Sequence, residues 1–456
     1  MTANRRYARA VLVLLLGLFL AAGAAPIRAE SEDGWQSTFR AGATDASGQE
    51  VGGTETVHLA AHNGRLYAGN GYWMDPRGYE HTPWAQVLVL ESPGGPWTVD
   101  LALGPRHARV TALESLTFAT DGEGRPLPAP VTLLLAASDS YGRPTESHIY
   151  TRNDGKGTWA RTTLRGDPKA RRSTRALIVH RDRETGIDRA FVAAGALGIY
   201  SGVYDAALPG RVRWNAEAEL GPLRIRPMAF AVANGRLYAS AGVSVYRRAD
   251  GASPAWEKVY TDDTREHWEL GGIRGLTAVP APDGRGESVL FSHTDRLIRI
   301  DPANEHRATV ELRIRPLLAK AWGMPVPGAI IAAYSRMRPL RDPATGRTVH
   351  VMGVEARVER GGKDKRYRQD TFFGWYAGGT YLIRDAAGAY RVGQVNGRWA
   401  PGKPKLVAPR AFAVSPFPAH AGGHVYAGGF DCNFFPARDT AWIFCAPVEK
   451  VLHPDP

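Results

Sequence analysis

Three acids and one histidine could carry acid–base chemistry in this chain: Asp139, Asp263, His267 and Asp431. Each lies in a polar stretch between apolar, β-rich segments, where loops are expected. A carboxylate near a histidine can transfer protons or hold a cation. We therefore treat these four as candidate catalytic residues, with solvated loop acids or turn caps as the alternative. No zinc-ligand spacing, phosphate-binding loop or dinucleotide motif is present, so neither a metal nor a cofactor is expected.

A second group of candidates combines aromatic rings with polar neighbours. The stretch 70–86 carries Trp73, Asp75, Tyr79, His81 and Trp84, and Tyr141 lies in a comparable later stretch. Flat rings with interleaved polar groups suit stacking on a sugar, so we expect these residues to bind ligand. The alternative is that an insertion of this length uses its aromatic residues as a small core of its own.

A third group consists of arginines placed at or just before apolar β-rich segments: Arg175, Arg226, Arg274 and Arg410. If these segments surround a channel, the guanidinium groups would meet at its mouth and bind an anion, because their geometry matches carboxylates and phosphates. The alternative is pairing with loop acids. We place His293 on the same side as a further ligand-binding candidate.

The elements that would position these residues are short strands in repeating groups. Residues 226–260 contain Met228–Val232, a turn at Asn234-Gly235, and three more β-rich runs, which is the pattern of an antiparallel meander. Apolar first strands recur at 56–60, 115–119, 175–179, 228–232, 275–279, 329–333 and 410–414. Second strands follow at 66–69, 133–137, 191–195, 237–240, 289–292, 349–353 and 425–428. This all-β repeat predicts a seven-bladed β-propeller, with eight blades as the alternative.

The two ends of the chain are expected to meet. The last repeat supplies three strands and stops near Pro447, whereas Trp35–Phe39 is a strand-like segment without a group of its own. Pairing the N-terminal segment with residues 440–445 would close the ring and remove exposed sheet edges. We expect Trp35, Trp97, Trp159, Trp214 and Trp256 to open outermost strands, and a short helix to begin near Pro316.

Residues 151–159, with the sequence Thr-Arg-Asn-Asp-Gly-Lys-Gly-Thr-Trp, resemble the Asp-box hairpin of sialidase-like secreted propellers. They differ by one extra residue and by Asn153 in the aspartate position. In that family the box is a structural turn between third and fourth strands, so the resemblance implies fold rather than catalysis. The arginine motif that opens sialidase domains is absent. The Asn-Gly-Arg-Leu-Tyr units at 63–67 and 234–238 also look like kelch-type repeats, which implies a binding module.

The first 29 residues have the pattern of a signal peptide. Basic residues precede the apolar run 11–20, which is too short to span a bilayer, and Ile27-Arg28-Ala29 fits a cleavage site. We expect a single domain over 30–456 that is periplasmic or secreted and has no membrane span. Removing the signal lowers the formal net charge from +12 to +8, a surplus that favours anionic partners. Nucleic acid is not expected for an exported chain without a recognition motif.

Two cysteines, Cys432 and Cys445, could form a disulfide in an exported protein, but a simple hairpin would place them too far apart. Together these patterns favour an exported propeller that binds an anionic glycan or a related small anionic ligand. One alternative is a glycoside hydrolase or polysaccharide lyase that uses carboxylates and a histidine on the same face. Another is a scaffold for a protein partner.

Overall fold

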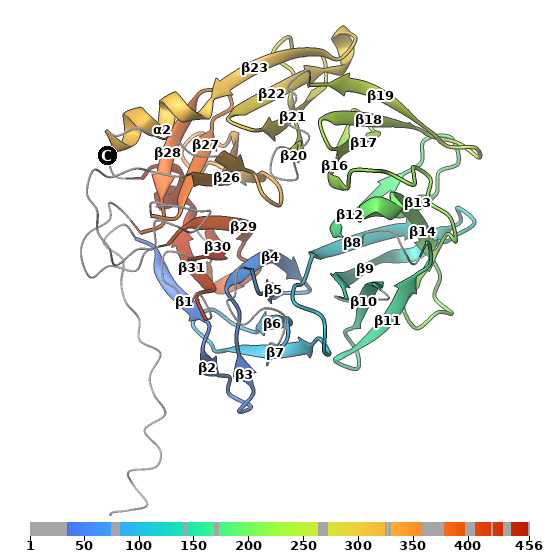
Figure 1. Cartoon of the computed structure of the whole chain (residues 1–456), viewed down its shortest axis with the longest axis horizontal. Helices are drawn as coiled ribbons and strands as arrows, with labels where there is room; N and C mark the ends of the chain where they lie inside the picture. The colour runs from blue at the N-terminus through green and yellow to red at the C-terminus, as the bar shows by residue number, and fades with distance from the viewer. Residues whose placement is uncertain are drawn as a thin grey trace, which may run out of the picture.

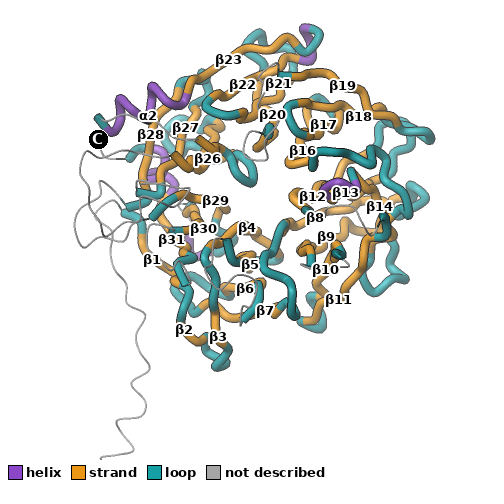
Figure 2. Tube along the Cα trace, in the orientation of Figure 1, coloured by secondary structure: helices purple, strands orange, loops and turns teal. Residues whose placement is uncertain are grey.

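The chain forms antiparallel sheets arranged in a ring, as the computed structural model in Figure 1 shows. The structure describes residues 34–73, 83–140, 145–167, 173–262, 272–323, 326, 330–356, 378–396, 406–420, 423–431 and 439–454. The propeller predicted from the sequence is therefore confirmed. Each sheet stands roughly radially, with its first strand nearest the axis and its last strand outermost (Figures 1 and 2).

Four sheets in the first part of the ring each use strands that follow one another along the chain. One contains β4 (Glu55–His62), β5 (Arg65–Gly71), β6 (Gln86–Leu90) and β7 (Trp97–Ala102). The next contains β8 (Ala112–Thr120), β9 (Pro126–Asp139), β10 (Ser147–Asn153) and β11 (Thr158–Leu164). It is followed by β12 (Thr174–Arg181), β13 (Asp188–Ala194), β14 (Ile199–Tyr204) and β15 (Val212–Trp214). Then come β16 (Pro227–Ala233), β17 (Arg236–Ala241), β18 (Ser244–Ala249) and β19 (Ala255–Thr261).

The second part of the ring is less regular. Strands β20 (Arg274–Pro280), β21 (Glu287–His293), β22 (Arg296–Asp301) and β23 (Arg307–Arg313) form an ordinary four-stranded sheet. In the next sheet β24 (Ile330–Ala332) and β25 (Arg338–Arg341) both pair with β26 (Thr348–Ala356), followed by β27 (Thr380–Arg384) and β28 (Tyr390–Gln394). The last group of strands holds β29 (Ala408–Val414), β30 (His424–Phe430), β31 (Trp442–Pro447) and the N-terminal β1 (Gln36–Arg40). The pair Phe430–Glu55 joins this group to β4, so that it forms one eight-stranded sheet with β4–β7.

The remaining elements are small. Strands β2 (Ala43–Thr44) and β3 (Glu50–Val51) form a separate hairpin. The helices in the described residues are α2 (Ile314–Trp322) and α3 (Val448–Leu452), with 3-10 turns η1 (Gly195–Leu197), η3 (Pro302–Asn304) and η4 (Pro418–His420). Helix α2 is the one predicted near Pro316, and it begins two residues earlier. No helix in the described part of the chain is long and apolar enough to cross a membrane.

Local turn chemistry sets the hairpins within each sheet. Between β16 and β17, Asn234 and Gly235 have φ of 49° and 66°, so both central residues of the two-residue turn are left-handed. Such turns match the twist of the flanking strands, and asparagine and glycine tolerate the conformation best. The tryptophan prediction holds for Trp97, which begins β7, but is wrong for Trp214, which ends the short strand β15. Asp205 to Arg211 form the turn before β15 and shorten this outer strand.

The N-terminal strand closes the ring. Strand β1 pairs antiparallel with β31, with Gln36 opposite Cys445 and Arg40 opposite Trp442. Trp35, immediately before β1, is 1% exposed, and its ring centroid lies 6.0 Å from that of Tyr381. The predicted pairing of the chain ends is therefore confirmed. It buries a large aromatic side chain that an exposed tail would leave in solvent.

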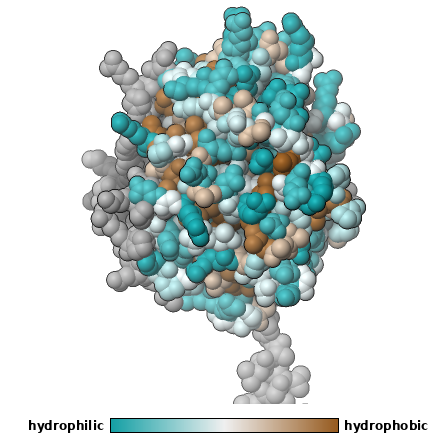
Figure 3. All heavy atoms as spheres, turned by 90° about the vertical axis from the view of Figure 1, so that its right-hand side faces the viewer, coloured by the Kyte–Doolittle hydropathy of each residue, from teal (hydrophilic) through white to brown (hydrophobic). Residues whose placement is uncertain are grey.

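The hydrophobic core lies between neighbouring sheets. One cluster joins Leu116 and Phe118 of β8 to Val192 of β13 and Tyr204 of β14, with the rings of Phe118 and Tyr204 5.8 Å apart. The outer surface differs from these interfaces. The side drawn at the right of Figure 1 is mostly hydrophilic in Figure 3, with smaller hydrophobic areas between polar groups. This packing holds the sheets as a rigid frame around the axis.

Candidate anion-binding site

The segment 333–337, which connects β24 to β25, reaches into the middle of the ring (Figure 1). We call it the central segment. Its Ser335 donates a hydrogen bond from Oγ to the Val57 carbonyl of β4 at 3.0 Å. Arg336 forms an ion pair with Glu114 of β8, with Nη2 and Oε2 2.6 Å apart. Contacts with separate sheets thus hold the central segment on the axis of the ring.

Tyr334 of the central segment is surrounded by four arginines. Its hydroxyl accepts hydrogen bonds from Arg109 Nη2 at 2.8 Å and from Arg175 Nη1 at 2.7 Å. The guanidinium carbons of Arg274 and Arg410 lie 5.1 and 3.9 Å from the centre of its ring. We call these four arginines the arginine cluster. All four lie at or near the start of innermost strands, so the ring geometry makes them converge.

Two carboxylates offset part of this charge. Glu55, the first residue of β4, pairs with Arg109, and its Oε2 lies 3.6 Å from Arg410 Nε. Glu355, near the end of β26, accepts a bond from Arg410 Nη1 at 2.7 Å. Both carboxylates are buried. The arginine cluster and these two acids therefore carry a surplus of two positive charges when Tyr334 is neutral.

The electrostatics of the central residues follow from this crowding. Burial alone would raise the pKa of Tyr334, but the charges of Arg109 and Arg175 outweigh it and lower the pKa to about 7. Burial also lowers the pKa of the Arg274 guanidinium to about 10, with Arg175 and Arg410 adding to the effect. The site is thus an electropositive environment that stabilises negative charge.

An aromatic side chain and a cavity adjoin the arginine cluster. The Trp73 ring lies 5.1 Å from the Arg109 guanidinium carbon and is 36% exposed, while its backbone N–H donates to Thr54 Oγ1 at 2.6 Å. Arg175 and Ser335 border a small cavity of about 50 Å³. Further residues lining this cavity include His58, Glu114, Arg336, Arg338 and Phe412.

The structure brings three of the four predicted arginines together at this site: Arg175, Arg274 and Arg410. Arg226 instead donates from Nη1 to Ser173 Oγ at 2.5 Å. His293 lies at the end of β21, where its Nδ1 is 2.7 Å from Asp262 Oδ2 and its Nε2 is buried, with no hydrogen-bond partner in the part of the chain that the structure describes. Trp73 adjoins the cluster through Arg109, and Trp84 is half-buried just before β6.

Of the four candidate catalytic residues, the structure describes two, Asp139 and Asp431. Asp139 accepts hydrogen bonds from Ser147 Oγ at 2.6 Å and from the Thr174 backbone and hydroxyl at 2.7 and 2.8 Å. These bonds tie β9 to β10 and β12, which is a structural role. Asp431 is buried just beyond β30. Burial lowers the pKa of the Arg40 guanidinium, and the negative charge of Asp431 partly offsets this effect. Six predicted site residues lie outside the described part of the chain: Asp75, Tyr79, His81, Tyr141, Asp263 and His267.

Sequence reasoning missed four residues of the site: Glu55, Arg109, Tyr334 and Glu355. Position in the sequence could have indicated three of them. The start of each first strand and the end of each second strand lie on the same face of the ring, and Glu55, Arg109 and Glu355 lie near such points. Strand β8 begins at Ala112, whereas the sequence predicted a start at Ser115. Arg109 therefore lay well before the predicted strand and was missed. The predicted strand 329–333 stopped one residue before Tyr334.

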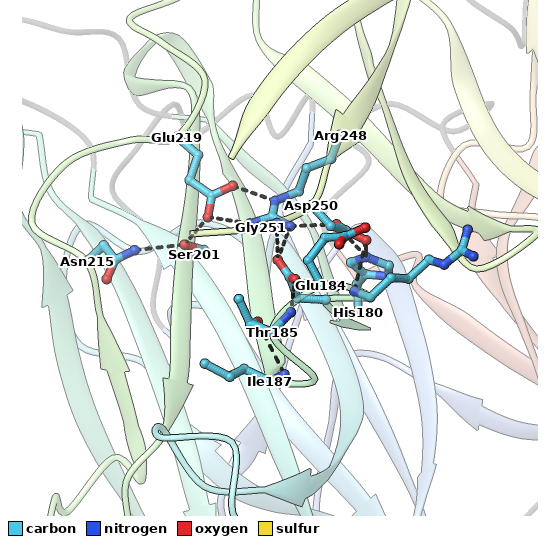
Figure 4. A network of polar contacts seen from close by, with 12 residues as sticks. His180, Glu184, Thr185, Ile187, Ser201, Asn215, Glu219, Arg248, Asp250 and Gly251 are labelled. Atoms are coloured by element: carbon cyan, nitrogen blue, oxygen red, sulfur yellow. Dashed lines mark hydrogen bonds and ion pairs between the residues drawn. The ribbon is translucent and has the colours of Figure 1, made fainter. Parts of the chain in front are cut away.

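A second charged network lies at the opposite ends of the strands and is satisfied within itself (Figure 4). The buried Arg248 donates to Asp182 at 2.8 Å, to Glu219 at 2.8 Å and to Asp250 at 2.6 Å. His180, at the far end of β12 from Arg175, contacts Asp250 at 3.0 Å. This network joins two sheets. Within the described residues, no group of three or more His, Cys, Asp or Glu side chains is placed to hold a metal ion.

No protein-family model and no curated protein matches this chain. Among solved structures, it is similar to Sqt1 of Chaetomium thermophilum bound to the N-terminus of ribosomal protein L10, with 11% identity, 86% of each chain covered and a TM-score of 0.42. It is also similar to the periplasmic gluconolactonase PpgL of Pseudomonas aeruginosa, with 15% identity, 67% and 84% coverage and a TM-score of 0.37. A third similar structure is the GH93 alpha-L-arabinofuranosidase of Fusarium graminearum with arabinobiose, with 10% identity, 92% and 99% coverage and a TM-score of 0.40.

Proposed function

We propose that this protein binds an anionic carbohydrate, or a related small carboxylate, at the arginine cluster. The observation that supports this most is the convergence of four guanidinium groups around Tyr334, with Glu55 and Glu355 as the carboxylates seen to pair with Arg410 in the described part of the chain. Crowding like charges away from water is costly unless a counter-charge is present. A bound carboxylate would supply that charge and match the planar fork of a guanidinium.

Trp73 favours a sugar acid over a simple inorganic anion. Its partly exposed ring lies against Arg109, so one ligand could place its carboxylate at the arginine cluster and its ring against the indole. Sugar rings present apolar C–H faces that pack on aromatic side chains, while their hydroxyls remain hydrogen-bonded.

The architecture that we propose for this function is a ring of seven blades formed by the residues 30–456. Each predicted first and second strand has a counterpart in the structure, and the pairing of β1 with β31 supplies an outer strand for the last sheet. We further propose that residues 1–29 direct the chain to the periplasm or the exterior, where acidic glycans are accessible.

An enzyme acting on such a sugar is the second candidate function. His293 supports it, because Asp262 fixes the Nδ1 side of the imidazole and the buried Nε2 has no hydrogen-bond partner among the described residues. Arg296 also donates to Asp262 at 2.8 Å, which helps to hold that carboxylate in place. A histidine oriented in this way can act as a general base or acid. Product analysis after incubation with glycans that bind would separate an enzyme from a binding protein.

The proposed function is tested by calorimetric titration of the mature protein with sodium D-glucuronate, with D-glucose as the neutral control. An array of acidic and neutral glycans extends the search. We expect glucuronate to bind in a salt-sensitive way and glucose to bind much more weakly. Loss of one charge-assisted contact is worth about 1.5–3 kcal/mol, so Arg175→Ala and Arg274→Ala should each weaken binding about tenfold or more.

The control is Arg247→Ala, because Arg247 makes an exposed ion pair with Glu257 on the outer part of a sheet. It should leave the affinity for glucuronate unchanged. Melting temperatures of all variants distinguish lost binding from lost folding. If no acidic sugar binds, or if the affinity ignores both Arg175 and Arg274, the proposed function is wrong.

A further inference from the structure

The Tyr334 hydroxyl is held in a way that suits a phenolate. Arg109 Nη2 and Arg175 Nη1 both donate to its oxygen, at 2.8 and 2.7 Å. A guanidinium can only donate hydrogen bonds, so neither contact can accept the proton of a neutral phenol. Hydrogen bonds to the charged form of a group, and cations next to it, both favour that charged form.

Within the described residues, the charged groups that face Tyr334 come from several sheets. The cations are Arg109 before β8, Arg175 of β12, Arg274 of β20 and Arg410 of β29. The acids are Glu55 of β4 and Glu355 of β26, and both pair with Arg410. Four positive charges against two negative ones leave room for one more anion among these groups. The pKa of Tyr334 agrees with this geometry. Burial acts to raise it, but the arginine charges outweigh burial and lower it to about 7.

We propose that Tyr334 is a phenolate near neutral pH and serves as the internal counter-anion of the arginine cluster, and that a carboxylate ligand binds with uptake of one proton at the Tyr334 oxygen. The second half of this inference rests on the proposed function. The balance is simple: the site takes up the ligand carboxylate and one solvent proton, and the phenolate becomes a neutral phenol. The total charge of the occupied site then equals that of the empty site.

The coupling predicts how affinity depends on pH. Since binding requires the proton, ligand affinity should be constant at acidic pH, where Tyr334 is already neutral. It should fall by up to about tenfold per pH unit above the midpoint of Tyr334 ionisation, by the linkage between proton and ligand binding. A site without this tyrosine would lack that dependence while keeping its arginine cluster.

The first test needs no ligand. Tyrosinate absorbs near 295 nm, so a titration from pH 5.5 to 9 of the wild type minus Tyr334→Phe isolates one residue among the 17 tyrosines. We expect one ionisation with a midpoint near 7. Other tyrosines should interfere little with this measurement. Burial raises the pKa of several of them, including Tyr150, Tyr238 and Tyr390, so they should stay neutral where Tyr334 ionises. A difference spectrum that stays flat up to pH 9 would overturn the inference.

A second variant guards against misfolding of Tyr334→Phe. Arg175→Gln keeps a hydrogen-bond donor but removes one cation, so the midpoint should move up by a measurable fraction of a pH unit or more. The exposed Arg247→Gln should leave the midpoint where it is. An unmoved midpoint in Arg175→Gln would count against the inference, because the absorbing tyrosine would then not be the one bonded to Arg175.

The coupling itself is tested by calorimetry with sodium D-glucuronate at pH 6, 7 and 8, in two buffers that differ in ionisation heat. Proton uptake approaching one per ligand above pH 7 supports the proposal, as does its loss in Tyr334→Phe. Binding without proton uptake overturns the coupling but leaves the proposed function standing. A midpoint near 7 with no glucuronate binding supports the phenolate and counts against the proposed function.

Discussion

Replacing Arg248 by methionine tests the idea that the network of Figure 4 holds two sheets together. The Arg248 side chain is fully buried and donates to Asp182, Glu219 and Asp250. Its guanidinium carbon lies 5.2 Å from the centre of the Phe191 ring. Methionine keeps much of the apolar stem, so the change removes the charge and the hydrogen bonds more than the packing. Three buried carboxylates then lose their shared cation.

The magnitude follows from that loss. Removing one partner of a buried ion pair costs about 3–5 kcal/mol, because the remaining charge is left uncompensated. Unfolding entropy is about 2.1 cal/mol/K per residue, or roughly 0.9 kcal/mol/K for roughly 420 residues. The Arg248→Met variant should therefore melt about 3–6 °C below the wild type at pH 7.5.

The effect should also depend on pH. Burial acts to raise the pKa of Asp182, but hydrogen bonds from Arg248 and from the Gly251 and Thr185 backbone reverse this and hold it well below its usual range. In the wild type this carboxylate therefore contributes stability above pH ~4, which is lost as the pH falls further. Without Arg248 the buried carboxylates should have raised pKa values, so the variant loses stability as the pH rises. The gap in melting temperature should narrow from pH 8 to pH 5.

Thermal unfolding followed by circular dichroism measures both quantities. The matched control is Arg247→Met in the same strand, since Arg247 forms an exposed pair with Glu257 that should contribute about 0–1 kcal/mol. If Arg248→Met and Arg247→Met melt within 1 °C of each other at pH 7.5, on the order of the error of the assay, the buried network does not stabilise the fold as argued.

Three further predictions concern the whole fold. A chain that starts at Ala41 should melt several degrees below one that starts at Gly34, because it lacks β1 and the buried Trp35; equal melting temperatures would contradict closure of the ring by β1. Burial lowers the pKa of His58 to about 3 and of His107 and His350 to about 4, so stability should fall below pH ~6.5 by up to ~1.4 kcal/mol per pH unit for each histidine. Urea unfolding at pH 7.5 and 5.5 checks this, and equal stabilities would refute it. Cys445 is a free, buried thiol whose pKa burial raises to about 12, so it should react with a thiol reagent only after unfolding; a 432–445 crosslink in a non-reducing peptide map would contradict this.

The secondary structure was predictable because its signals are local. Alternating apolar residues and turn residues such as Asn234-Gly235 located the first and second strands, each of which has a counterpart in the structure. Cys445 lies opposite Tyr426 in the antiparallel pair of β30 and β31. The outer strands were less predictable. Trp214 shows this, since the turn formed by Asp205 to Arg211 precedes β15, which starts only at Val212, and Trp214 is its last residue.

The site was predictable only where it depended on these local signals. Arg175, Arg274 and Arg410 stand at or near the starts of apolar strands, so the sequence indicated that they face one end of the ring. Arg226 occupies a similar position but contacts Ser173, because the side chain's direction depends on its neighbours in the next sheet. The position of an arginine along its strand therefore indicated on which face of the ring it lies, but not which residue it contacts.

The sequence by itself determined that the chain forms repeated β-meanders and that arginines begin several of them. Only the tertiary structure decided that the central segment 333–337 interrupts an inner strand and places Tyr334 on the axis, among residues up to 279 positions away in the chain, such as Glu55. Strand formation depends on alternation and turns within a few residues, which a sequence displays directly. The charge balance around Tyr334 depends on the closure of the ring, which brings Arg109, Arg175, Arg274 and Arg410 from four sheets to one point.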